Sequence, residues 1–288
     1  MAVAGKSLIA MLKARLDLVA PLAVVDVGAN PLGKPVYKPL VNAGLAHIWG
    51  FEPNPEAFAK LENSPKASFL PLAVGQGGQT DFHAYPSSEM SSLYPLSASA
   101  VGYLGHFRRH MGQDTVTQID THRLDDIAEI PQIDLLKVDA QGAERDVIAG
   151  AQIKLAQAVM VIAEMRFYRL YDGEPMLHAL DETLRDQGFV LHRFLHQKSR
   201  MLHHSQKARV NARALSSQLI DGDAVYIRSF EDRSAWSDGQ LRALVMLAAC
   251  IGSHDLALLA LDTLVSRGLV RKNLPAAYVD HLPQELRV

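Results

Sequence analysis

The chain has 288 residues, of which 48% are hydrophobic and 21% are charged, as in ordinary globular proteins. Its 31 acidic residues slightly outnumber its 29 lysines and arginines, so it lacks the basic excess that is typical of a general nucleic-acid-binding protein. No apolar run is long enough to span a membrane, and one cysteine, Cys250, excludes an internal disulfide and a cysteine-based zinc site. We expect a soluble, cytoplasmic protein with no membrane span and no nucleic-acid partner.

Short apolar runs alternate with helical patterns along most of the first 230 residues. An amphipathic helix is expected over 6–19. Strands are expected over 22–27, 46–51, 68–74, 133–138, 159–163, 189–194 and 224–227, and helices over 35–44, 55–62, 143–156 and 174–187. Runs that are apolar on both faces are typical of a parallel sheet covered by helices. The pattern predicts a doubly wound α/β fold with a mostly parallel, seven-stranded sheet.

Two regions depart from this alternation. Residues 75–122 contain no clear helix–strand unit and predict an inserted hairpin and loop. After Phe230, residues 238–251 and 254–268 have the apolar spacing of two helices. We therefore assign 1–230 to one α/β domain and 231–288 to a C-terminal helical extension. The apolar faces of the extension must be buried, either on the α/β domain or in a homo-oligomer.

Polar residues and glycine end the first two predicted strands, where open α/β sheets bind their ligands. Gly28 allows a ligand to approach the backbone closely, and Asp26 can pair with a cationic amino group of a ligand or cap a tight turn. Glu52 is placed to hold the hydroxyls of a ribose, although a solvated charge is the simpler alternative. Asn30 stands where a dinucleotide motif would have its second glycine. Together these residues favour a nucleoside site of another kind.

The fourth predicted strand carries the segment IDLLKVDAQGAE, residues 133–144. Lys137 and Asp139 share one face of this strand, because alternate residues of a strand do. Asp139 lies at the end that faces the turn after the first strand, and Glu144 begins the next helix, where a carboxylate suits the positive end of the helix dipole. A lysine–aspartate ion pair at the edge of the sheet is the alternative reading.

The blocks DVGAN, FEPNPEAF, LPLAV, SSL, LDDI, IDLLKVDAQGAE and VIAEM occur in this order. Over about residues 20–230 the sequence resembles the FkbM family of S-adenosylmethionine-dependent methyltransferases. The resemblance implies the class I methyltransferase (Rossmann-like) fold, S-adenosylmethionine as cofactor, and methyl transfer to a hydroxyl of a sugar, glycoconjugate or secondary metabolite. It implies a set of cofactor contacts: Asp26, Gly28, Asn30, Glu52, Asn54, Ala73, Val74 and Asp139. Ala73 and Val74 would flank the adenine, and residues 87–94 would form a loop over the cofactor.

The first turn departs from the family pattern DxGANxG, because Pro31 and Leu32 replace the single residue before Gly33. Two alternatives to a methyltransferase are therefore considered. A nicotinamide-dependent oxidoreductase would also use an acid at Glu52, but the chain lacks its glycine motif. A non-catalytic protein with the cofactor fold would bind a partner through the C-terminal helices.

Methyl transfer to a hydroxyl needs alignment of the two reactants and removal of a proton. Asp139 is the first candidate base and Glu164 the second, with three histidines of the inserted region as rivals: His83, His106 and His110. Lys137 and Arg166 are candidate contacts to the acceptor. No spacing of two histidines and one carboxylate is present, and we predict no metal.

Residues 187–220 contain no aspartate or glutamate but carry six basic residues: Arg193, Lys198, Arg200, Lys207, Arg209 and Arg213. If the sixth strand ends near Leu195 and runs parallel to the first five, the following loop emerges on the cofactor side of the sheet. Arg200, Lys207 and Arg209 would then hold an anionic acceptor, such as a nucleotide-linked or lipid-phosphate-linked sugar. A solvated loop without function is the alternative.

Overall fold

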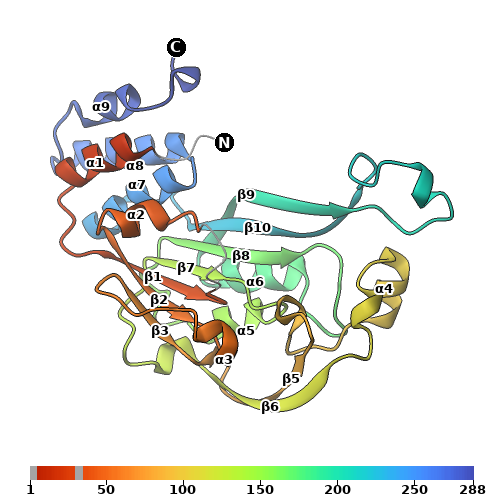
Figure 1. The fold of residues 1–288 in the computed structure, drawn as a ribbon. Helices are drawn as coiled ribbons and strands as arrows, with labels where there is room; N and C mark the ends of the chain where they lie inside the picture. The colour runs from red at the N-terminus through yellow and green to blue at the C-terminus, as the bar shows by residue number, and fades with distance from the viewer. Residues whose placement is uncertain (1–4, 30–34) are drawn as a thin grey trace.

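The computed structural model describes residues 5–29 and 35–288. Its centre is a seven-stranded sheet in the order β3-β2-β1-β7-β8-β10-β9 (Figure 1). Strand β10 runs antiparallel to both of its neighbours and the other pairs are parallel, so β9 points the same way as the remaining five strands. The predicted fold class is confirmed. The strands are β1 (Leu22–Val27), β2 (Ala46–Phe51), β3 (Ala67–Leu70), β7 (Leu135–Val138), β8 (Met160–Arg166), β9 (Phe189–Arg200) and β10 (Gln218–Arg228).

Helices cover both faces of the sheet, which explains why its strands are apolar throughout. All six residues of β1 are buried. Leu22 and Val24 belong to the hydrophobic cluster that includes α1 (Lys6–Arg15) and α2 (Lys38–Asn42), whereas Val25 and Val27 belong to the cluster that includes α5 (Glu144–Ala149) and α6 (Leu177–Asp186). The two-residue period of the strand therefore assigns its side chains to opposite layers.

Several helices are shorter than predicted. α1 ends at Arg15 rather than near residue 19, and Asp17 beyond it has a left-handed backbone with φ of 44°. α2 covers only Lys38–Asn42, and α3 is a single turn, Pro55–Phe58. α5 stops at Ala149, and the chain continues to residue 157 as turns.

The inserted region forms the predicted hairpin, in which β5 (Gly78–Ala84) pairs antiparallel with β6 (Thr115–His122). The prediction of one strand over 68–74 is wrong, because the chain leaves the main sheet at Leu70 and then joins the hairpin as β4 (Ala73–Val74). Pro71 lies at the break and has no N–H to donate to a ladder. The helix α4 (Ala98–Leu104), which was not predicted, is capped by the buried Ser97.

The C-terminal helices pack on the sheet, as one of the two sequence-based alternatives expected. α7 (Asp238–Cys250) and α8 (His254–Ser266) share one hydrophobic cluster with α1 and with residues of β1, β8 and β10. A third helix, α9 (Leu274–Asp280), was not predicted and adds Leu274 and Tyr278 to the same cluster. The apolar faces of these helices are thus largely covered within the chain. Among the described residues, no helix is long and apolar enough to cross a membrane.

Strands β9 and β10 are longer than predicted and form a hairpin that extends beyond the other strands toward α4 (Figure 1). The sequence predicted only residues 189–194 and 224–227. The added residues, 195–200, 218–223 and 228, are mixed in polarity, and most of them are not fully buried. Apolar periodicity therefore missed them, and the connecting segment is 201–217.

Candidate functional site

A cavity of about 510 Å³ lies at the carboxyl ends of β1, β2, β7 and β8. This volume lies in the range of small-molecule sites. Seven of the predicted cofactor-binding and catalytic residues line it: Gly28, Glu52, Asn54, Ala73, Val74, Asp139 and Glu164. Met90, Ser91, Ser92 and Leu93 line it too, so the predicted loop over the cofactor position borders the same cavity.

Gly28 allows the ends of β1 and β7 to come into contact. Its φ is 80°, in the left-handed region, and a Cβ at this position would lie 2.0 Å from the backbone oxygen of Asp139. Its N–H donates to the carbonyl of Phe51 at 3.0 Å. Only glycine can both adopt this φ and leave room for the backbone of Asp139, so this part of the cavity lining requires glycine.

Glu52 is held at the end of β2 by the turn that follows it. Its Oε1 accepts a hydrogen bond from the backbone N–H of Asn54 at 2.8 Å. The Asn54 side chain caps α3 by accepting from the N–H groups of Glu56 and Ala57. Burial raises the pKa of Glu52, and the hydrogen bond from Asn54 opposes this shift. The carboxylate is therefore held in a fixed position in the wall of the cavity, which Ala73 and Val74 also line.

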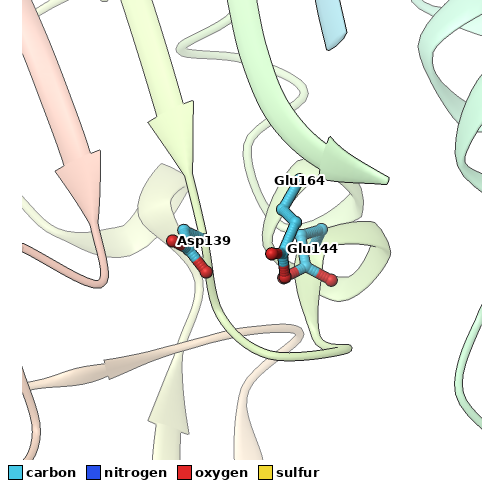
Figure 2. A group of neighbouring side chains, drawn as sticks. All are labelled: Asp139, Glu144 and Glu164. Carbon is cyan, nitrogen blue, oxygen red and sulfur yellow. The ribbon is translucent and has the colours of Figure 1, made fainter. Parts of the chain in front are cut away.

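Three carboxylates, Asp139, Glu144 and Glu164, gather at the ends of β7 and β8 (Figure 2), with oxygens within 4.8 Å of one another. Glu144 is the first residue of α5, as predicted, and accepts hydrogen bonds from the N–H groups of Ala140 (2.8 Å) and Gly142 (3.0 Å). Burial raises its pKa to about 7. Glu144 therefore closes the turn that carries Asp139.

Gln141 connects the other two carboxylates. Its Nε2 donates to Asp139 Oδ1 at 2.9 Å and to Glu164 Oε2 at 3.2 Å, and its Oε1 accepts from Arg166 at 2.9 Å. Its backbone is left-handed, with φ of 49°, and its carbonyl accepts from the Ser92 hydroxyl at 2.5 Å. Strain of this kind persists only where surrounding contacts enforce it. Sequence analysis did not identify Gln141 as a site residue, because no local signal connects it to Arg166.

Arg166 supplies a positive charge that pairs with several carboxylates of the site. It is 4% exposed, and its guanidinium lies 3.0 Å from Glu164, 3.4 Å from Glu174 and 3.1 Å from Asp221. Burial opposes its charge, but these carboxylates raise its pKa overall. Although Arg166 borders the cavity, its guanidinium is engaged by the protein itself, unlike the free acceptor contact that the sequence suggested. Burial raises the pKa of Glu164 well above its usual value, although Arg166 opposes this shift.

The three carboxylates are the group of described residues whose oxygens could together hold a metal ion. Glu164 is already paired with Arg166, and Gln141 donates to both Asp139 and Glu164. Two of the three carboxylates are therefore already engaged by groups of the protein itself. The arrangement therefore gives no separate reason to assign a metal.

Asp26 and Lys137 lie away from this cavity. The Asp26 carboxylate is buried and accepts hydrogen bonds from the Tyr37 hydroxyl and from Lys137 Nζ, the latter at 3.2 Å. Both residues line a second cavity, of about 610 Å³, which meets the first at Gly28 and Asp139. The sequence considered an ion pair between Lys137 and Asp139, but in the structure Lys137 pairs with Asp26. Asn30 and the altered turn 31–33 lie outside the described residues.

The candidate histidines do not line the first cavity. His83 Nδ1 lies 2.7 Å from Asp114 Oδ2 on the inserted hairpin, and His110 contacts Arg109. Lys198 and Arg200 do line the cavity, whereas Lys207 and Arg209 do not. Asp139 and Glu164 are therefore the predicted bases that reach it.

The model of the methyltransferase FkbM domain matches residues 26–191, which is more than half of the chain. The chain belongs to the FkbM methyltransferase family. This family membership makes the protein a methyltransferase with S-adenosylmethionine as cofactor, and it decides against a nicotinamide-dependent oxidoreductase.

Two curated proteins resemble this FkbM-family chain. The 2-O-methyltransferase NoeI of Sinorhizobium fredii is 29% identical over 171 residues, which cover 56% of this chain and 70% of NoeI. The hexuronic acid methyltransferase AglP of Haloferax volcanii is 27% identical over 158 residues, which cover 51% of this chain and 62% of AglP. The similarity therefore spans a little over half of this chain.

Solved structures resemble it more distantly. The crystal structure of an FkbM methyltransferase from Methylobacillus flagellatus has 12% identity and a TM-score of 0.36, and the match covers 72% of this chain and 43% of that one. Magnesium protoporphyrin IX methyltransferase from Synechocystis has 14% identity and a TM-score of 0.37, with 77% of each chain covered. The family assignment rests on the sequence match and not on these structures.

Proposed function

We propose that this protein transfers a methyl group from S-adenosylmethionine to a hydroxyl of a sugar unit in a glycan, glycoconjugate or related metabolite. The observation that carries the proposal is the cavity, which has Glu52 at the end of β2 and the Asp139–Gln141–Glu164 group beyond β7 and β8. The names of the two curated relatives, a 2-O-methyltransferase and a hexuronic acid methyltransferase, support a sugar acceptor.

The residues at the β2 end of the cavity fit the nucleoside part of the cofactor. Glu52 Oε2 receives no hydrogen bond from any described residue, so it is available to a ribose hydroxyl. Ala73 and Val74 offer an apolar wall beside it for the adenine. When bound, S-adenosylmethionine supplies an electrophilic methyl group with a good leaving group. The protein then has to align the acceptor and take up its proton.

Asp139 is the base that the geometry favours. Its Oδ1 is held by Gln141, while its Oδ2 accepts no hydrogen bond from the described residues. Glu164 is instead ion-paired with Arg166 through Oε2, the oxygen that also accepts from Gln141, although burial raises its pKa overall. We assign Glu164 to orienting the acceptor hydroxyl. Gln141 is a positioning residue, since both of its amide hydrogens are donated to these carboxylates.

The test is transfer of a labelled methyl group from S-adenosylmethionine to a panel of neutral and acidic sugars. Asp139→Asn should lower kcat by about 10²–10⁴-fold and leave cofactor affinity unchanged. Gln141→Ala should lower kcat by about 10²-fold through misplacement of both carboxylates. The matched control is Asp186→Asn, on the exposed end of α6. If cofactor binds but no sugar is methylated, the acceptor class is wrong, and a near-parental rate for Asp139→Asn would reject it as the base.

We also infer the division of labour along the chain. Residues 1–230 would form the catalytic domain, and 231–288 would support it from behind the sheet without taking part in the chemistry. The described residues of the extension contribute nothing to the lining of the first cavity, and their apolar side chains belong to the cluster on the α1 side of the sheet.

A further inference from the structure

Two segments without acidic residues meet beside the cavity. Residues 187–220 contain no aspartate or glutamate, and neither do residues 90–113. The Tyr103 hydroxyl donates to Gln218 Oε1 at 3.2 Å, and Gly105 backs directly onto His203, where a Cβ would lie 2.2 Å from the Cβ of the histidine. The end of the β9–β10 hairpin and the region of α4 therefore pack against each other, and Figure 1 shows them close together.

The two segments carry many basic residues, and we call this set the basic wall: Arg108, Arg109, Lys198, Arg200, Lys207, Arg209 and Arg213, with His106, His203 and His204. The pKa of His203 is lowered by desolvation and by the positive charges of Lys207 and Arg108. Positive charges from both segments thus act on one side chain. Such a concentration of one sign, in a chain whose net charge is −2, attracts anions.

Two residues connect the basic wall to the cavity. Lys198 lies 3.5 Å from Asp221, a carboxylate that Arg166 already pairs with at 3.1 Å. Arg200 also lines the cavity, forms no salt bridge with a described residue, and has a buried Nε with no hydrogen-bond partner among them. A buried donor without a partner is costly, and ligand binding is one way to satisfy it. A guanidinium is also suited to bidentate binding of carboxylate or phosphate.

We propose that Arg200, supported by Lys198 and the basic wall, binds an anionic group of the acceptor, a carboxylate or a phosphate ester on the sugar, and so selects anionic glycans. The inference rests on the proposed function and names the acceptor class of the same site. It also corrects the sequence-based assignment, because Lys207 and Arg209 belong to the outer part of the wall and act by long-range attraction. The acceptor hydroxyl lies at Asp139 while its anion lies at Arg200, since both residues line one cavity.

The experiment compares matched acceptors with the full chain and S-adenosylmethionine: methyl glucoside, glucuronic acid and glucose 1-phosphate. Arg200→Gln should raise the KM for the anionic acceptors by about tenfold to a hundredfold, from loss of hydrogen bonds to a charged group, with little change in kcat or for the neutral sugar. Arg200→Lys should give an intermediate KM, because lysine keeps the positive charge but lacks the planar guanidinium that can bind an anion through two hydrogen bonds. Lys207→Gln with Arg209→Gln should flatten the salt dependence of the KM. Lys272→Gln, on an exposed distant site, is the matched control.

The two acidic acceptors separate a carboxylate from a phosphate as the recognised anion. Equal KM values for neutral and anionic sugars, or an unchanged ratio in Arg200→Gln, would overturn the inference while leaving sugar methylation intact. If no acceptor turns over, calorimetric binding of glucuronic acid and glucose 1-phosphate in the presence of S-adenosylhomocysteine decides the matter. Binding that Arg200→Gln weakens supports the anion site, and absence of binding by the parent rejects it.

Discussion

Replacement of Glu52 tests the placement of the cofactor. Glu52→Ala removes the carboxylate that faces the cavity at the end of β2. In the structure Oε1 is committed to the N–H of Asn54, so only Oε2 remains for a ribose hydroxyl. One hydrogen bond to a charged group is worth about 1.5–3 kcal/mol. We therefore expect S-adenosylhomocysteine to bind about 10- to 150-fold more weakly, as calorimetry would measure.

Two further variants separate this loss from a change in the turn. Glu52→Gln can still accept from Asn54 through its amide oxygen but has no charge, so it should bind more weakly than the parent by a smaller factor than Glu52→Ala. Glu56→Gln changes an exposed carboxylate one turn away, at the start of α3, and should leave affinity unchanged. Circular dichroism checks that all three variants are folded. Affinity within twofold of the parent in a folded Glu52→Ala protein would refute the ribose assignment.

Three other predictions concern stability. Arg166→Met leaves three carboxylates without the positive charge that pairs with them, and it should lower the free energy of unfolding by about 3–5 kcal/mol, as urea denaturation would measure. An unchanged urea midpoint would contradict the role of Arg166. Because burial raises the pKa of Glu144 to about 7, its native state holds a proton that the unfolded state has lost, so this group reduces stability as pH rises from about 4.5 to 7. The stability of Glu144→Gln relative to the parent should therefore increase over that range, and a constant difference would argue against the shift. Truncation after Phe230 uncovers the cluster shared with α1 and should give an insoluble or loosely packed product; a soluble, cooperatively unfolding fragment would disprove that dependence.

The sequence by itself determined where β1, β2 and β7 end. Apolar runs that stop at Gly28, Glu52 and Asp139 predicted three polar positions at one edge of a parallel sheet, and the structure places all three around one cavity. This works because parallel strands joined by crossovers end on the same side. The same two-residue period also explains the position of Asp26, which pairs in register with Lys137 and faces the layer of Leu22 and Val24.

Only the tertiary structure decided which charges meet. Gln141 reaches Arg166, 25 residues further along the chain, and no periodic pattern encodes that contact. The hairpin beyond Leu195 was missed because it leaves the helical layers and loses the apolar alternation that marks a strand. Its encounter with the segment around Gly105 brings basic residues together across about a hundred residues of sequence. The periodicity of apolar residues in the sequence indicates which face of each helix or strand is buried. Ion pairs and cavities depend instead on the distances between elements, which are set only when the layers pack together.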